Sequence, residues 1–276
     1  MRAAAPEREA QGGPATGPSV PTPGETPMTT DLSVRDTNVY APEVSEVYDL
    51  LYQGRGKDYA REARILVDLI RARKADANSL VDVACGTGEH LRTLRTVFDH
   101  VEGVELSDTM RAAAAEKLPG VLVHPGDIRD FRLGRTFDAV TSMYSTVGYM
   151  RSTAELDAAV SAMAGHVSPG GVLIVEPWYF PHKFIDGHIG DDVIRTEGRT
   201  VARIARSVRH GDAVHQQAHY VVADSAGVRH FEHVQIFTLF SPAEYEAAFL
   251  RAGCTVEYVE PGDILAGRGL FVGIRH

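Results

Sequence analysis

The residues of this sequence that could best do chemistry begin with a glycine-rich turn. Residues 81–90 read VDVACGTGEH, with Gly86 and Gly88 where a strand-like run passes into a helix-like one. Glycine lets the backbone pass close to a ligand, and the helix N-terminus offers unpaired N–H groups and a positive dipole. A tight turn without a ligand also favours glycine, so the turn alone leaves the choice open.

Two acids follow the turn at informative positions. Glu105 ends the next strand-like run, 23 residues after Asp82, where a carboxylate can accept two hydrogen bonds from a ribose diol. Asp127 follows Gly126 after a third run and could accept from an adenine amino group, with Ile128 beside the ring. Either acid alone could be a helix cap or a solvated charge. Their order after the turn favours a site for an adenosyl group.

The form of the turn favours one adenosyl cofactor over another. CGTG is shorter than the G-x-G-x-x-G fingerprint of dinucleotide sites, which disfavours an NAD-dependent oxidoreductase. SPGGVLIVEP (168–177) resembles the element before the fifth strand of class I S-adenosylmethionine (SAM) dependent methyltransferases. Together VDVACGTG, GVELS, GDIRDF and SPGG resemble that superfamily over residues 80–177. The resemblance implies SAM as cofactor.

Alternating strand and helix patterns must position these residues. Apolar residues at helical spacing predict helices over 44–52 and 57–73, separated by QGRG (53–56). Strands alternating with helices predict an α/β fold of the class I methyltransferase (Rossmann-like) type, with a mainly parallel sheet and helices on both faces. The strands are expected at 79–85, 100–106, 121–127, 137–144 and 172–177, and the further helices at 88–98, 107–118 and about 153–166.

After the fifth strand the rhythm changes. Strand-like runs at 200–210, 214–224 and 228–240, joined at Gly211 and Gly227, predict an antiparallel β meander. A helix over 241–253 and closing strands in CTVEYVE and GLFVGIRH follow. We therefore expect a disordered extension (1–37), a SAM-binding core with an N-terminal helical lid (38–177), a substrate-side insertion (178–236) and the C-terminal part of the core sheet (237–276).

Composition narrows the class of protein. The 276 residues are 44% hydrophobic and 24% charged, which predicts a globular protein with a core. The net charge of -9 argues against nucleic acid as a partner. No apolar run could span a bilayer, and the two cysteines are too few for a disulfide framework, so we expect a cytoplasmic protein without membrane contact. Residues 1–35 hold six of the fourteen prolines, and Met28 could be the true start.

A finer resemblance points to a substrate. The chain from about Val39 onward is similar to the nucleotide-sugar N,N-dimethyltransferases of the desosamine and mycaminose type, which make dimethylamino sugars for macrolide antibiotics. The tracts that carry it are VYDLLYQGRGKDY (47–59), SLVDVACGTG (79–88), GDIRDFRLGR (126–135), EPWYFP (176–181), FTLFSPAEYEAAF (237–249) and GRGLFVG (267–273). It implies two methylations of the 3-amino group of a TDP-3-amino-3,6-dideoxyhexose.

The resemblance also implies roles for single residues. Tyr40 and Tyr48 would lie near the methyl donor and the sugar amine, with Arg55 and Tyr59 at the entrance and Arg268 on the diphosphate. Tyr149 stands where some relatives have histidine, and EPGDILAGRGLF approaches Arg268 through a longer segment than in relatives. The expected sugar-facing residues are Glu176, Trp178 and Tyr179, and the expected cofactor-binding residues are Tyr48, Ala84, Gly86, Gly88, Glu105, Asp127, Ile128 and Met143.

Methyl transfer makes modest demands on a protein. The acceptor nitrogen and the methyl carbon must be held about 3–3.5 Å apart and in line. The amine must be neutral, and a low-dielectric site disfavours its ammonium form. A nearby carboxylate or tyrosine can orient the amine or accept its proton. Tyr40, Tyr149 and Glu176 are therefore the expected catalytic residues. Aromatic walls would admit the product of a first transfer for a second one.

A diphosphate would need local positive charge in this acidic chain. If strand 200–210 alternates simply, Arg206 shares the more apolar face with Ile204 and Val208, points inward, and becomes a second phosphate ligand. It could equally be an arginine at the sheet edge. Seven of the twelve histidines lie between His182 and His233 without metal-site spacing, so no metal is expected.

Two other functions and the oligomeric state remain open at this point. Cofactor motifs do not choose the acceptor, so another small-molecule N- or O-methyltransferase is possible, as is a non-catalytic SAM-binding protein. A homodimer is also possible, because nothing in the sequence pattern decides the oligomeric state.

Overall fold

The computed structural model describes residues 40–260, 262 and 268–276. These residues lie within one compact unit, Asp36–His276. The expected disorder of residues 1–37 and the start at Met28 lie outside the described residues.

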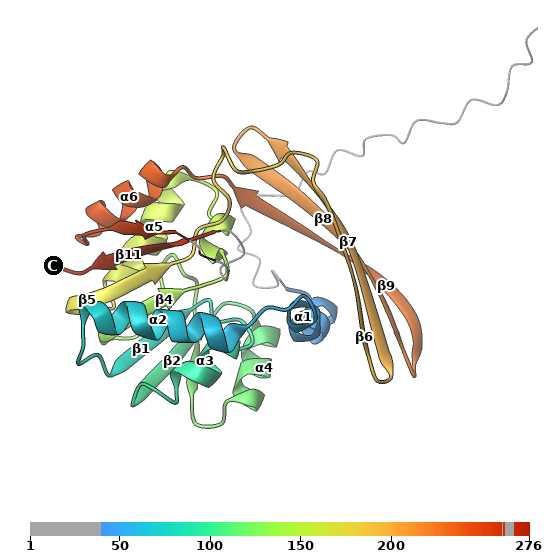
Figure 1. Ribbon diagram of the computed structural model, residues 1–276, viewed down its shortest axis with the longest axis horizontal. Coiled ribbons are helices and arrows are strands. Elements are labelled where there is room, and N and C mark those ends of the chain that lie inside the picture. The colour runs from blue at the N-terminus through green and yellow to red at the C-terminus, as the bar shows by residue number, and fades with distance from the viewer. Residues whose placement is uncertain (1–39, 261, 263–267) are drawn as a thin grey trace, which may run out of the picture. The chain divides into compact units, whose positions relative to one another are not determined.

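A seven-stranded sheet forms the centre of the described part of the chain, in the order β10-β11-β5-β4-β1-β2-β3 (Figure 1). The strands β1 to β5 run parallel, and β11 runs antiparallel to both of its neighbours, β5 and β10, so the predicted methyltransferase fold is confirmed. The carboxyl ends of β1, β2 and β4 meet at the point where the strand order reverses, which is where open α/β sheets bind ligands. The strands are β1 (Ser79–Val83), β2 (His100–Glu105), β3 (Leu122–Pro125), β4 (Phe137–Ser142), β5 (Val167–Val175), β10 (Glu257–Val259) and β11 (Leu270–Ile274).

Helices bury both faces of this sheet. On one face α5 (Thr153–Ala164) and α6 (Pro242–Arg251) contribute Leu156, Val160 and Phe249 to a core with Val81 and Val140. On the other face, residues of α2 (Tyr59–Arg73) and α3 (Glu89–Leu94) pack with those of β1 and β5. Helix α4 (Asp108–Lys117) lies beside β3 and is capped by Ser107, whose hydroxyl accepts from the Met110 N–H.

A second sheet follows β5, as predicted, but it has one more strand than expected. In the described residues it runs β6-β7-β8-β9, all antiparallel, as β6 (Ile189–Thr196), β7 (Arg199–His210), β8 (Ala213–Asp224) and β9 (Gly227–Thr238). Strand β6 carries Asp191 and Asp192, a residue type that is depleted in strands, which explains why its pattern was not recognised. Strand β9 continues two residues past the expected boundary at 236.

The inward face of β7 is the reverse of the one predicted. Val201, Arg203, Ala205 and Ser207 are buried, whereas Arg206 is exposed on the opposite face with its neighbours Ile204 and Val208 exposed or half-buried. The prediction took the more apolar set as the inner one. It fails because the inner face of β7 carries Arg203 and Ser207 where it lines a cavity, so alternation does not tell the two faces apart.

Helix α1 (Pro42–Gly54) joins the second sheet to the cofactor side. Val47 and Leu51 pack on the inner face of that sheet against Val201, Ala218 and Val222. On the cofactor side, the Thr87 hydroxyl of the glycine-rich turn donates to Asp49 of α1, and the Thr109 hydroxyl donates to the carbonyl of Tyr40, just before the helix. Helix α1 thus contacts both the second sheet and the glycine-rich turn, and its role as a lid stays a prediction.

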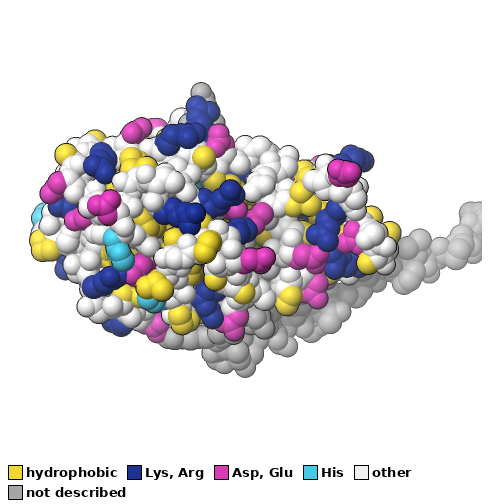
Figure 2. All heavy atoms as spheres, turned by 90° about the horizontal axis from the view of Figure 1, so that it is seen from below, with side chains coloured by type: hydrophobic (Ala, Val, Ile, Leu, Met, Phe, Trp, Pro, Cys, Tyr) yellow, Lys and Arg dark blue, Asp and Glu magenta, His cyan; other side chains and the backbone are white. Residues whose placement is uncertain are grey.

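No helix among the described residues is long and apolar enough to cross a membrane. On the face of the molecule drawn in Figure 2, basic and acidic side chains are interspersed with apolar ones. This face has the character of an ordinary solvated surface.

Candidate functional site

The glycine-rich turn and Glu105 are joined directly. The Gly86 N–H donates to Glu105 Oε2 at 2.8 Å, and the Ser107 N–H donates to Oε1 at 2.8 Å. Glu105 is 7% exposed, and burial raises the pKa of its carboxyl group, partly opposed by the N–H donors of Ser107 and Gly86. Ala84 begins the turn with φ 59°, a left-handed conformation that is costly for a residue with a Cβ. Such strain is typical of a site where geometry matters.

The third strand brings Asp127 to the same edge of the sheet. The Gly126 N–H donates to the Glu105 carbonyl at 3.3 Å. Asp127 therefore comes directly after a residue that is paired with Glu105 on the neighbouring strand. Its carboxylate is buried and accepts from Arg129 Nη2 at 2.6 Å and Nε at 2.9 Å. Ile128 is buried beside it, and Met143 is buried just after β4. The turn, Glu105 and Asp127 therefore follow the carboxyl ends of neighbouring strands, and their roles toward a cofactor stay a prediction.

The two glycines of the turn are needed for different reasons. A Cβ on Gly86, which has φ +57°, would meet nothing within 4 Å, so the space beside it is open to a ligand. A Cβ on Gly88 would lie 2.5 Å from Leu118 Cδ1, so Gly88 is needed by the packing of α4 as well as by its φ of +79°. The open space at Gly86, with Glu105 and Asp127 beside it, fits the ribose and adenine of SAM.

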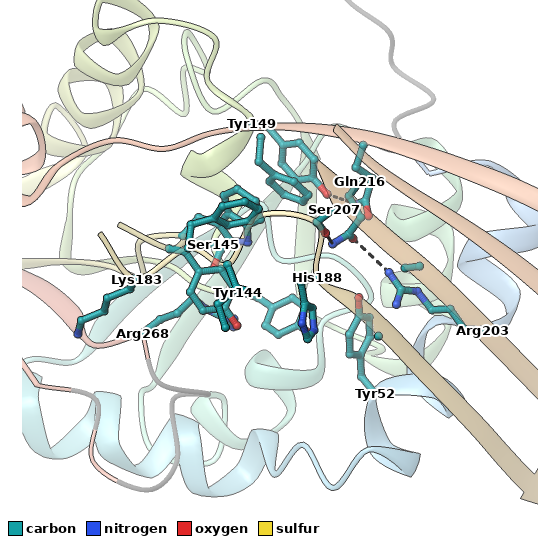
Figure 3. Close-up of a pocket in the computed structure, with 18 of the residues that line it drawn as sticks. Tyr52, Tyr144, Ser145, Tyr149, Lys183, His188, Arg203, Ser207, Gln216 and Arg268 are labelled. Atoms are coloured by element: carbon teal, nitrogen blue, oxygen red, sulfur yellow. Dashed lines mark hydrogen bonds between the residues drawn. The ribbon is translucent and has the colours of Figure 1, made fainter. Parts of the chain in front are cut away.

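An aromatic cavity of about 330 Å³ lies between this edge and the second sheet. Small-molecule sites have volumes of roughly 300 to 1,000 Å³. Figure 3 shows Arg203, Ser207 and Gln216 of the second sheet on one side of it, and Tyr144 and Ser145, which follow β4, on the other. Six residues singled out in the sequence line it, namely Tyr40, Arg55, Tyr149, Trp178, Tyr179 and Arg268.

Two tyrosines from distant parts of the chain share a hydrogen bond in this cavity. The Tyr40 and Tyr149 hydroxyl oxygens are 2.9 Å apart, and Gln235 Nε2 donates to the Tyr149 hydroxyl. Burial raises the pKa of Tyr149, and it raises that of Tyr40. Both phenols are therefore neutral at physiological pH and act as hydrogen-bonding groups. Tyr48 packs between the rings of Tyr40 and Tyr52, at 5.5 and 4.6 Å between centroids.

A strained turn after β4 presents Tyr149. Tyr144 and Ser145 both adopt left-handed conformations, with φ 57° and 63°. The Tyr144 N–H donates to Glu176 Oε2 at 2.6 Å, and the Ser145 hydroxyl donates to the Pro177 carbonyl at 2.9 Å. The short 3-10 helix η1 (Thr146–Tyr149) follows. The end of β5 thus holds the strained backbone from which Tyr149 projects.

Glu176 lies beneath the cavity wall instead of on it. Its side chain is 1% exposed, and Oε1 accepts from Arg268 Nε at 3.0 Å. Arg268 faces the cavity over the rings of Tyr144 and Tyr179, 5.4 and 5.6 Å from their centroids. Burial disfavours the charge of Arg268, but Glu176 together with Tyr144 and Tyr179 outweighs that effect, and the pKa of Arg268 is raised. Both carboxylate oxygens of Glu176 are therefore engaged in holding wall residues.

Tyr59 does not line the entrance that the sequence predicted. Its ring packs on His90, 5.1 Å between centroids, behind the glycine-rich turn. His90 Nε2 and Lys57 Nζ contact the Glu62 carboxylate at 2.8 and 2.7 Å. Lys57 also lies 4.1 Å from the centre of the Tyr144 ring. This buried network ties α2, the turn and the cavity wall together.

Substitution of Glu62 should reduce stability in a pH-dependent way. Burial alone would raise the pKa of Glu62, but the hydrogen bond with His90 and the charge of Lys57 outweigh it and lower the pKa. A lowered folded-state pKa contributes stability above the unfolded pKa, about 4.3, which is lost as pH falls through the folded pKa. We expect Glu62→Gln to cost about 3 kcal/mol of unfolding free energy at pH 7.

Urea unfolding between pH 4 and pH 8 measures this effect. The difference from the wild type should be largest near neutrality and shrink toward the acid end. Asp68→Asn, at an exposed position of the same helix, is the control and should show little change at either pH. A pH-independent loss in Glu62→Gln would contradict the ionic role of the network.

The sequence did not single out several cavity residues. Phe237 stacks on Trp178 at 4.2 Å, and Arg203 approaches from β7. Tyr52 stood inside the tract VYDLLYQGRGKDY but had no assigned role. Those on β7, β8 and β9 were hidden because the inner face of these strands could not be chosen from the pattern, and the rest lie in connecting segments without a regular pattern. These residues are Tyr52, Tyr144, Ser145, Lys183, His188, Arg203, Ser207, Gln216, Gln235 and Phe237.

Comparisons with known proteins agree with this site. A family model described as "Methyltransferase domain" matches residues 80–171. The chain is 54% identical to dTDP-3-amino-3,4,6-trideoxy-alpha-D-glucopyranose N,N-dimethyltransferase of Streptomyces venezuelae, over 86% of this chain and 99% of that protein. It is 48% identical to dTDP-3-amino-3,6-dideoxy-alpha-D-glucopyranose N,N-dimethyltransferase of Streptomyces fradiae, over 85% and 92%.

A solved structure agrees as well. It is that of SAM-bound CalS10, an amino pentose methyltransferase of Micromonospora echinaspora involved in calicheamicin biosynthesis. The TM-score is 0.78 at 51% identity, over 83% of this chain and 97% of that one.

The parallel sheet, the acid-lined turn and the matched domain define a class I SAM-dependent methyltransferase. SAM is its cofactor. Within that class, the chain belongs to the family of dTDP-aminosugar N,N-dimethyltransferases.

Proposed function

We propose that this protein transfers two methyl groups in succession to the 3-amino group of a TDP-linked 3-amino-3,6-dideoxyhexose, for a dimethylamino sugar of a macrolide-type antibiotic. The observation that carries the proposal is the aromatic cavity lined by Tyr40 and Tyr149, because it offers a pocket for an acceptor in addition to the open space at Gly86. The relatives at 54% and 48% identity supply the acceptor class.

The cofactor side follows from the residues at the strand ends. Glu105 would accept from the ribose hydroxyls and Asp127 from the adenine amino group, with Ile128, Ala84, Gly88 and Met143 enclosing the adenosyl group. Tyr48 would close it from α1. When bound, SAM supplies an activated methyl group. The protein's task is then to bring the acceptor nitrogen into line.

The acceptor side is built from rings and neutral hydroxyls. Tyr40 and Tyr149 would orient the amine through their paired hydroxyls, 2.9 Å apart. Their burial disfavours an ammonium ion and so favours the nucleophilic free amine. Aromatic walls at Trp178 and Tyr179 leave room for a nitrogen that already bears one methyl group. Arg55 and Arg268 would contact the nucleotide end, while Glu176 positions Arg268 and Tyr144.

The proposal can be tested by mass analysis of the product. The protein is incubated with SAM and a TDP-3-amino-3,6-dideoxyhexose, and gains of one and then two methyl groups are expected. The corresponding 3-hydroxy sugar nucleotide is the control and should gain none. SAM binding without any methylated aminosugar would instead indicate another acceptor or a non-catalytic SAM-binding protein. The homodimer and the cytoplasmic location stay predictions, to be checked by light scattering and by cell fractionation.

A further inference from the structure

The cations of the cavity differ in how their charge is balanced. Arg55 forms an ion pair with Asp192, and Arg268 forms one with Glu176. Lys183 reaches the cavity from an exposed position. Arg203 is only 6% exposed, and its hydrogen bonds go to neutral groups. Within residues 40–260, 262 and 268–276, no carboxylate forms an ion pair with it.

The surroundings of Arg203 fix its guanidinium group. Nε donates to the Tyr220 hydroxyl at 3.2 Å, and Nη2 donates to Gln216 Oε1 at 3.1 Å. Gln216 in turn donates to the Ser207 hydroxyl at 3.0 Å. These bonds use one edge of the guanidinium group and leave the N–H groups of Nη1 for a ligand. Figure 3 shows Arg203 and Arg268 on opposite sides of the cavity.

A buried charge without a counter-charge is costly, and proteins normally pair it. An arginine with a fixed orientation at the wall of a ligand cavity is suited to a phosphate group. We infer that Arg203 is an anion ligand of the substrate cavity and contacts the diphosphate of the nucleotide sugar. This inference rests on the proposed function. It assigns the role of second phosphate ligand to Arg203, on the inner face of β7, in place of Arg206 on the outer face.

Nucleotide binding to the enzyme tests the inference through the chain's single tryptophan. Trp178 lines the same cavity, so its fluorescence can report the binding of dTDP and of thymidine. Arg203→Gln should bind dTDP about 10- to 100-fold more weakly than the wild type, because it loses a hydrogen-bonded charge. Thymidine, which lacks the diphosphate, should bind the variant and the wild type equally well. SAM affinity should not change.

Arg206→Gln is the matched control, because it removes the same charge from the same strand on the exposed face. It should leave dTDP affinity within about two-fold of the wild type. Arg203→Lys keeps the charge but loses the planar fork, and should bind dTDP several-fold more weakly than the wild type. This second variant carries the test if Arg203→Gln does not fold in a thermal melt.

The outcomes separate the two proposals. If Arg203→Gln weakens the binding of dTDP and of thymidine equally, Arg203 contacts the base or shapes the cavity. If its dTDP affinity is unchanged, Arg203 does not contact the diphosphate. Either result overturns the inference about Arg203 but leaves the proposed function standing. A wild-type protein that binds SAM but neither nucleotide ligand would overturn the proposed substrate class, and the inference with it.

Discussion

Glu105→Ala should weaken SAM binding by about 100-fold or more, the largest effect expected of any cofactor-site substitution. The carboxylate accepts from the Gly86 and Ser107 N–H groups, both at 2.8 Å. The substitution removes the expected ribose acceptor and leaves two backbone donors without their partner. Buried donors without acceptors are costly, so the glycine-rich turn should also lose its fixed geometry. Isothermal titration with SAM measures the change directly.

A control for Glu105 lies on the same strand. Glu102 is 1% exposed and pairs with His100, His124 and Arg135 on the side away from the cofactor turn. Glu102→Gln should reduce stability but leave the SAM affinity of the folded protein unchanged. If Glu105→Ala binds SAM as tightly as the wild type while remaining folded, the assignment of the cofactor site is wrong.

Glu176→Gln should reduce stability by about 3 kcal/mol, because it leaves the buried charge of Arg268 without its counter-charge. The neutral amide also presents N–H groups toward either Arg268 or the Tyr144 N–H. The strained turn at Tyr144 and Ser145 should then loosen, and activity should fall with it. Urea unfolding and steady-state kinetics with varied aminosugar nucleotide measure the two effects.

A double variant separates charge pairing from catalysis. Glu176→Gln combined with Arg268→Met should recover most of the lost stability but not the activity, because the buried charge is gone while the cavity wall is still altered. Glu257→Gln, which breaks an exposed pair with Arg73, is the control and should change stability by less than about 1 kcal/mol. A direct proton-accepting role for Glu176 would appear differently. Glu176→Gln would then lower kcat and change its pH profile, while Arg268→Met would keep kcat.

The sequence by itself determined the cofactor half of this protein. The turn at Gly86 and the acids Glu105 and Asp127 each belong to a short strand-and-turn pattern, and such patterns depend mainly on neighbouring residues along the chain. The parallel order of those strands then follows from the alternation with helices, which places their carboxyl ends at one edge. The predicted convergence therefore needed no knowledge of distant contacts.

Only the tertiary structure decided the acceptor half. The alternation in β7 left open which face of the strand turns inward. Packing against the sheet places Arg203 on the inner face and Arg206 on the exposed face. The Glu176–Arg268 pair and the Tyr40–Tyr149 hydrogen bond join residues 92 and 109 positions apart. Such partners are chosen by packing between elements, which no local pattern encodes. The partners of a residue such as Glu176 therefore could not be predicted from its type and position in the sequence.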